Sequence, residues 1–113
     1  MWAKPVEIHR HAREAIRGFS KEVRIELGSA LIKLQLGMAL GFPISRPMPG
    51  IYSGAYELRF RDASGIQRVF YYLKSQGAIL VFHAFVKKTQ KTPLSEMTLG
   101  RKRLMEMLSN EKI

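Results

Sequence analysis

The spacing of apolar residues changes once along the chain, at a proline- and glycine-rich segment between residues 41 and 50. Before this segment apolar residues recur at steps of three and four, which predicts helices. After it they alternate with polar residues, which predicts strands. A helical part is thus followed by a sheet-forming part, and the 113 residues have the length of a single domain, spanning residues 1–113.

Two helices are predicted in the first part, after a short alternating segment at residues 6–9 that could form a strand. The first helix covers residues 11–17 and stops at Gly18. A second follows Ser20, whose hydroxyl can cap it. Its predicted buried stripe consists of Val23, Leu27, Ala30, Leu31, Leu34 and Met38.

A β-hairpin is predicted after the proline-rich segment, which itself reads as a loop. Its strands lie on either side of a turn at residues 62–65. Residues 78–86 are almost wholly apolar, as in a central strand that is buried on both faces. Thr92 before Pro93 then opens a last helix, which Gly100 weakens.

The chain is strongly basic, with 19 Lys and Arg against 9 Asp and Glu and a net charge of +10. This imbalance favours a polyanionic partner such as nucleic acid, although a basic surface without a function is the alternative. We find no signal peptide and no apolar run long enough to cross a bilayer, so we expect a cytoplasmic protein with no membrane role. The absence of cysteine removes disulfides and thiolate metal sites.

Arginine and aromatic residues are predicted to gather on one face of the hairpin. If the apolar residues of the first strand face the helices, Arg59 and Arg61 lie together on the opposite face. Arg68, Phe70 and Tyr72 share one face of the next strand, where Arg68 can lie beside Arg59. Guanidinium groups bind RNA phosphates and rings stack on bases, so we expect an RNA-binding face. The alternative is a solvated face whose rings pack across strands.

Lysines follow the apolar strand where the sheet ends, namely Lys87, Lys88 and Lys91. Beside the arginines they could form a phosphate site, although such runs are often only solvated ends. His83, inside the apolar strand, is more typical of a hydrogen-bonded core residue than of a catalyst. No metal-binding motif, nucleotide-binding loop or Ser/His/Asp set is present, so we expect neither a metal nor a small-molecule cofactor.

Three segments match a known family: YELRF at residues 56–60, RVFYY at 68–72 and HAFVKKTQKTP at 83–93. In this order and at these distances they resemble the phage-derived RelE-like toxins often labelled HigB. The resemblance covers about half the chain, and the helical part agrees in layout. It implies an α+β fold: a small antiparallel sheet with two N-terminal helices packed on one face, a C-terminal helix, and an RNA-facing surface on the other side.

The resemblance also implies a function. Such a protein is the toxin of a type II toxin–antitoxin system and cleaves messenger RNA in the ribosomal A site without metal. A cognate antitoxin, usually a helix-turn-helix protein, neutralises it. By strand position Arg59 and Arg68 match the basic residues around the scissile phosphate, and Lys87 or Lys88 matches the basic position at the end of the last strand.

The predicted reaction is attack by a ribose 2′-hydroxyl on the adjacent phosphate, with a lysine as general acid or base. Some relatives carry a tyrosine in or near the last helix, and none follows Pro93 here. Either Tyr71 or Tyr72 takes its place, or the general base is another group. Two other functions stay open: a ParE-like inhibitor of DNA gyrase with the same fold, and an RNA-binding module without catalysis.

Overall fold

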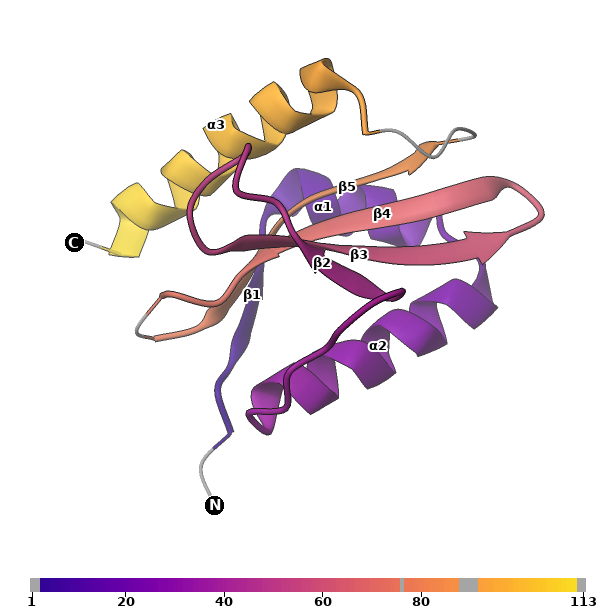
Figure 1. Cartoon of the computed structure of the whole chain (residues 1–113), viewed down its shortest axis with the longest axis horizontal. Coiled ribbons are helices and arrows are strands. Elements are labelled where there is room, and N and C mark those ends of the chain that lie inside the picture. The colour runs from indigo at the N-terminus through magenta and orange to yellow at the C-terminus, as the bar shows by residue number, and fades with distance from the viewer. Residues whose placement is uncertain (1–2, 76, 88–91, 112–113) are drawn as a thin grey trace.

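Three helices and one five-stranded sheet make up the fold of the computed structural model (Figure 1). It describes residues 3–75, 77–87 and 92–111, apart from the side chain of residue 111. In chain order the elements are β1 (Val6–Ile8), α1 (Arg10–Arg17), α2 (Lys21–Gln35), β2 (Ser45–Pro47), β3 (Ala55–Asp62), β4 (Gly65–Tyr72), β5 (Ile79–Lys87) and α3 (Leu94–Glu111).

The strands follow the order β1-β5-β4-β3-β2 across the sheet. Strands β2 to β5 pair with antiparallel neighbours, whereas β1 pairs with β5 in parallel, with Val6 opposite Ile79. The predicted α+β fold, with two N-terminal helices and a C-terminal helix around a small sheet, is confirmed. The parallel edge strand β1 adds to the predicted antiparallel sheet. A long crossover connects it to its partner β5.

The end of α2 differs from the prediction. The helix begins after Ser20, whose hydroxyl accepts a hydrogen bond from the amide of Val23 at 3.3 Å. It ends at Gln35, and Gly37 then turns the chain with a φ of +83°, which favours glycine. Met38 therefore lies outside the helix and is 52% exposed, so its place in the buried stripe is wrong. The stripe is otherwise buried or partly buried as predicted.

The sheet carries a hydrophobic core on each face. Helices α1 and α2 cover the first core, to which the sheet contributes Leu58, Val69 and Tyr71. Helix α3 covers the second, where Leu104 packs against Phe70 and its neighbours. Figure 1 shows α2 and α3 on opposite sides of the sheet. The expectation that the second face is open to RNA is therefore wrong where α3 lies over β4 and β5.

Strand β2 was not predicted, because the segment between residues 41 and 50 reads as a loop. Its sequence, Ser45–Pro47, has no apolar alternation, and Pro47 is tolerated because β2 is an edge strand. The register places Arg46 opposite Glu57. This short strand thus brings a further arginine to the hairpin.

A shift in register between β4 and β5 alters which residues of β5 face α3. The shift occurs between Phe70 and Tyr71, and it leaves Phe82 without a partner on β4. The ring of His83 consequently lies beside Phe70, with ring centres 5.4 Å apart, on the α3 side of the sheet.

In the part of the chain that the structure describes, no helix combines the length and hydrophobicity needed to cross a bilayer.

Candidate nucleic-acid interface

Arg59 and Arg68 are directly opposite each other in the hairpin, as the strand pattern predicted. The turn at residues 62–65 fixes this register, since Asp62 pairs with Gly65 and every later pair follows. The glycine has a φ of +133°, which other residues rarely adopt. The two guanidinium groups are thus brought together by the shortest loop of the sheet.

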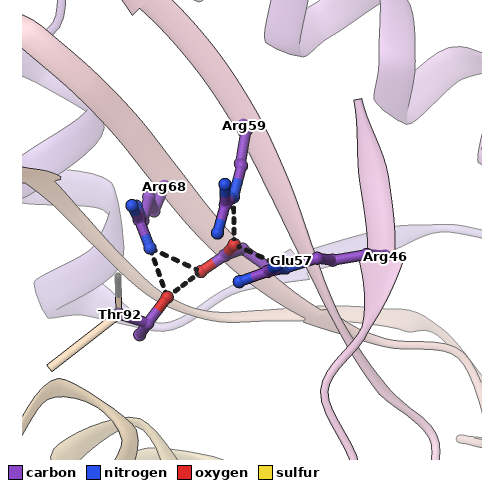
Figure 2. Close-up of polar contacts among 5 residues, drawn as sticks. All are labelled: Arg46, Glu57, Arg59, Arg68 and Thr92. Atoms are coloured by element: carbon purple, nitrogen blue, oxygen red, sulfur yellow. Dashed lines mark hydrogen bonds and ion pairs between the residues drawn. The ribbon is translucent and has the colours of Figure 1, made fainter. Parts of the chain in front are cut away.

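Glu57 binds these arginines and a third one. Its Oε1 accepts a hydrogen bond from Arg59 Nε at 2.6 Å and lies 3.4 Å from Arg46 Nε. Its Oε2 accepts a hydrogen bond from the hydroxyl of Thr92 at 2.7 Å and lies 3.6 Å from Arg68 Nη1. Thr92 Oγ1 in turn accepts a hydrogen bond from Arg68 Nη1. Figure 2 shows these five side chains, which we call the arginine cluster.

One side of the cluster is buried and the other is closer to the surface. The side chains of Glu57 and Arg68 are 0% exposed, whereas those of Arg59 and Arg46 are 19% and 33% exposed. Burial lowers the pKa of Arg68, and the charge of Glu57 opposes this effect. An arginine keeps its proton even so, and the three guanidinium groups exceed the single carboxylate in charge. The prediction places Arg68 on an RNA-binding face, whereas its side chain is buried.

The two predicted stacking rings are buried. Phe70 is 0% exposed and Tyr72 is 8% exposed, and both belong to the core under α3. Phe70 packs against the rings of Phe82 and Phe85, with centres 5.8 and 5.6 Å apart. Packing across strands, the alternative reading of these rings, is what the structure shows. The prediction that bases stack on Phe70 and Tyr72 is wrong for this conformation.

Two further predicted site residues, Arg61 and Lys87, lie toward the turn end of the sheet. Arg61 is exposed and Lys87 is half-buried. Together with Ile66 they form one row across the sheet. Lys88 and Lys91 lie outside the described residues. Arg61 and Lys87 therefore extend the positive charge of the cluster along the end of the sheet.

Neither tyrosine on β4 lies at the cluster. Tyr71 faces α2, and its hydroxyl is 2.6 Å from the Ser45 hydroxyl, while burial raises its pKa. Tyr72 follows Arg68 by four residues, about 13 Å at a rise of about 3.3 Å per residue. The suggestion that one of them supplies the general base at the arginines is not supported by their positions.

His83 binds α3 through both ring nitrogens. Its Nδ1 is 2.8 Å from Arg103 Nη1, and its Nε2 is 2.7 Å from Glu96 Oε1. A guanidinium only donates, so Nδ1 accepts and Nε2 donates its proton to Glu96. The interpretation of His83 as a hydrogen-bonded core residue is confirmed. Among the described residues, no group of three or more His, Asp and Glu could hold a metal ion.

Sequence reasoning did not assign three members of the cluster to the site. Glu57 carried a usable signal, because it shares a strand face with Arg59 two residues later. Thr92 was predicted only as a helix cap. Arg46 gave no signal, because its strand was not predicted.

Comparison with known proteins identifies one family and one related fold. The family model described as Phage derived protein Gp49-like (DUF891) matches residues 14–105. Among solved structures, the chain is similar to the E. coli toxin RelE, in a free-state mutant with two arginines changed to alanine. The TM-score is 0.59 at 15% sequence identity, over 94% of this chain and 98% of that one. At this identity the similarity shows the fold. A search of curated proteins finds no significant match.

Proposed function

The chain belongs to the phage-derived Gp49-like family, and from this premise we propose that it is the toxin of a type II toxin–antitoxin system that cleaves messenger RNA. The RelE fold supports this proposal. The observation that carries it is the arginine cluster, in which Arg59 and Arg68 lie side by side at the start of α3. Clustered guanidinium groups are suited to a phosphodiester and to the extra charge of its transition state.

The proposed reaction uses the RNA's own nucleophile. The ribose 2′-hydroxyl attacks the adjacent phosphorus, the bond to the 5′-oxygen breaks, and a 2′,3′-cyclic phosphate and a 5′-hydroxyl form. Arg59 stabilises the phosphorane directly, and the buried Arg68 supports it from beneath. Lys87 and Lys88 are the candidates for moving the proton from the nucleophile to the leaving oxygen.

We place this reaction on the ribosome, in the cytoplasm. No base-stacking ring is exposed on the described part of β4, so the protein alone offers few groups that orient the RNA. A ribosome that holds the message in its A site would supply that orientation. The proposed partner in the inactive state is a cognate antitoxin, of the helix-turn-helix class.

Translating ribosomes that carry a defined message test this proposal. The protein should cut the message and leave a 2′,3′-cyclic phosphate or a 3′-phosphate. A single 2′-deoxyribose at the cleaved position should block the cut, because it removes the nucleophile. Arg59→Ala should be inactive, and Arg24→Ala, on the outer face of α2, should be active. Products ending in a 3′-hydroxyl would contradict the mechanism, and inhibition of gyrase supercoiling without RNA cleavage would support the ParE-like function instead.

A further inference from the structure

We infer that Arg46 and Arg59 form a clamp for one phosphate group of single-stranded RNA, and that Glu57 is the positioning residue that holds Arg59 by a hydrogen bond and Arg46 by an ion pair. The identity of the ligand rests on the proposed function. The clamp itself rests on the contacts within the arginine cluster. It shifts the RNA-contacting role from the buried Arg68 to Arg46, on the edge strand β2.

The first support is the way both arginines meet the same carboxylate oxygen. Arg59 Nε donates a hydrogen bond to Glu57 Oε1 at 2.6 Å, and Arg46 Nε forms an ion pair with the same oxygen at 3.4 Å, without a hydrogen bond. A guanidinium group is a planar fork, so fixing its Nε toward one partner also fixes the direction of its two Nη atoms. One buried oxygen therefore sets the direction of the Arg59 fork by a hydrogen bond and attracts the Arg46 fork of the neighbouring strand by its charge. Figure 2 shows both side chains converging on this carboxylate from β3 and β2.

The second support is the difference in exposure within the cluster. Glu57 and Arg68 are fully buried, while Arg59 and Arg46 reach the surface. A phosphate arriving from solvent would meet Arg46 and Arg59 first. The carboxylate beneath them is itself held by Thr92 at 2.7 Å, so the clamp is anchored to the start of α3. Side chains held in this way lose less freedom when a ligand binds.

The third support is the charge around the clamp, which favours a polymer over a single anion. Three guanidinium groups surround one carboxylate, so the cluster stays positive despite Glu57. Arg61 follows Arg59 on the same face of β3, at an exposed position. Cations at successive positions along a strand suit the successive phosphates of an RNA backbone.

Binding of a short single-stranded RNA at several salt concentrations tests the clamp. Arg46→Ala should weaken binding and reduce the slope of log Kd against log salt by about 0.7, the loss of one phosphate contact. Arg46→Lys keeps the charge but not the fork, and its affinity should stay below that of the wild type. Arg24→Ala is the control for general charge, and its slope should not change. The clamp is refuted if Arg46→Ala binds like the wild type or no worse than Arg24→Ala, or if Arg46→Lys restores full affinity.

The role of Glu57 is tested by a change in which charge and positioning predict opposite results. Glu57→Gln removes a negative charge, so charge alone predicts tighter RNA binding. Positioning predicts weaker binding, because the amide holds the two guanidinium groups less firmly than the carboxylate does. Tighter binding by a folded variant would overturn the role of Glu57. If Glu57→Gln does not fold, Arg46→Ala and Arg46→Lys decide whether the clamp exists. Both should fold, since Arg46 is partly exposed on an edge strand.

Messenger RNA cleavage by the same variants separates this inference from the proposed function. If the wild-type protein binds RNA through Arg46 but cuts no message, the clamp holds and the proposed function fails. If the wild type cuts messages and Arg46→Ala binds and cuts equally well, the proposed function holds and the clamp fails. Reduced binding and reduced cutting by Arg46→Ala support both.

Discussion

Arg68 is the largest fully buried side chain in the described part of the chain; Glu57 compensates its charge, and Thr92 accepts a hydrogen bond from it. Strand alternation placed it correctly on the face of Arg59. Alternation cannot show what covers a face, and here Thr92 lies against the guanidinium group. A residue that resembles a surface cation in the sequence is therefore part of a buried ion pair.

Replacing Arg68 should cost far more stability than replacing Arg61. Arg68→Ala leaves the carboxylate of Glu57 buried with less compensation, and removing one partner of a buried pair costs about 3–5 kcal/mol. Arg61→Ala removes an exposed charge and should change the free energy of unfolding by no more than about 0.5 kcal/mol. Urea unfolding followed by circular dichroism measures both. Equal midpoints for the two variants would show that the cluster does not support the fold.

The second buried ionisable group of interest is His83, which binds Glu96 and Arg103. Burial lowers its pKa from the ordinary value of 6.5, the charges of Arg103 and His9 act in the same direction, and Glu96 opposes them. The folded protein thus binds fewer protons at this site than the unfolded chain does. The contribution of neutral His83 to the free energy of unfolding is complete above pH 6.5. It is lost as the pH falls from there toward the lower pKa of His83 in the folded state.

The loss of stability in mild acid should therefore depend on His83. The wild-type free energy of unfolding should fall between about pH 7 and about pH 5, starting near the unfolded histidine pKa of about 6.5. His83→Gln, which does not titrate, should show a shallower fall over the same range. His11→Gln, at an exposed position, serves as the control and should follow the wild type. Parallel pH curves for all three proteins would exclude this role of His83.

Helix α3 lies close to the sheet at Gly100. A β-carbon at this position would meet Phe70 Cδ2 at 2.9 Å and His83 Cβ at 3.5 Å. Gly100 looked in the sequence like a weak point of the last helix. In the structure the lack of a side chain is what allows the helix to approach the rings of β4 and β5.

Two glycine-to-alanine changes in helices should consequently have opposite effects. Gly100→Ala should destabilise the protein by about 1–3 kcal/mol, because Phe70 is fully buried and has little room to move. Gly28→Ala in α2 meets nothing within 4 Å and should stabilise the protein by about 0.5–1 kcal/mol through helix propensity. Thermal unfolding should give a lower midpoint for the first variant and a higher one for the second. A higher midpoint for Gly100→Ala would mean that α3 does not pack this closely.

Sequence reasoning predicted the two N-terminal helices and the hairpin from their periodic patterns, β1 from a short alternation, the central strand from its apolar run, and α3 from the Thr92-Pro93 start. Strand β2 was missed because it contains a proline and lies in a proline- and glycine-rich segment, and because it forms by pairing with its neighbour β3. The register shift in β5 was missed because a continuous apolar run shows no alternation to interrupt.

The candidate site was predictable to the extent that it depends on local pattern. The pairing of Arg59 with Arg68 follows from the hairpin and its turn. Arg46 and Thr92 reach Glu57 from distant parts of the chain, so only tertiary packing brings them there. Phe70 and Tyr72 are buried because α3 packs on their face of the sheet, and the sequence of β4 alone does not encode which face α3 covers.

At the scale of the whole molecule, a net charge of +10 is carried by a body with a radius of gyration of 13.2 Å. The proposed antitoxin should therefore be attracted from a distance if the segment that covers the arginine cluster is acidic. We expect that segment to lie across β3, where Arg59 and Arg61 reach the surface.

Association with the antitoxin should slow as salt is raised, because screening weakens the attraction between the oppositely charged surfaces. Stopped-flow measurements at low and high salt give the rate constants. Arginine-specific labelling, read by mass spectrometry, should show that Arg59 or Arg61 becomes protected in the complex. A footprint restricted to α1 and α2 would contradict direct occlusion of the cluster.

The parallel pairing of β1 with β5 has a consequence for the order in which the protein can assemble during its synthesis. Val6 is made long before its partner Ile79, because helices α1 and α2 and the strands β2, β3 and β4 lie between them in the sequence. Until then the first strand has no sheet to join, and β4 lacks its second neighbour. Thr92, which anchors Glu57, emerges later still. A nascent or prematurely terminated chain that lacks Thr92 therefore lacks the complete cluster, so the cluster can form only after this residue has been made.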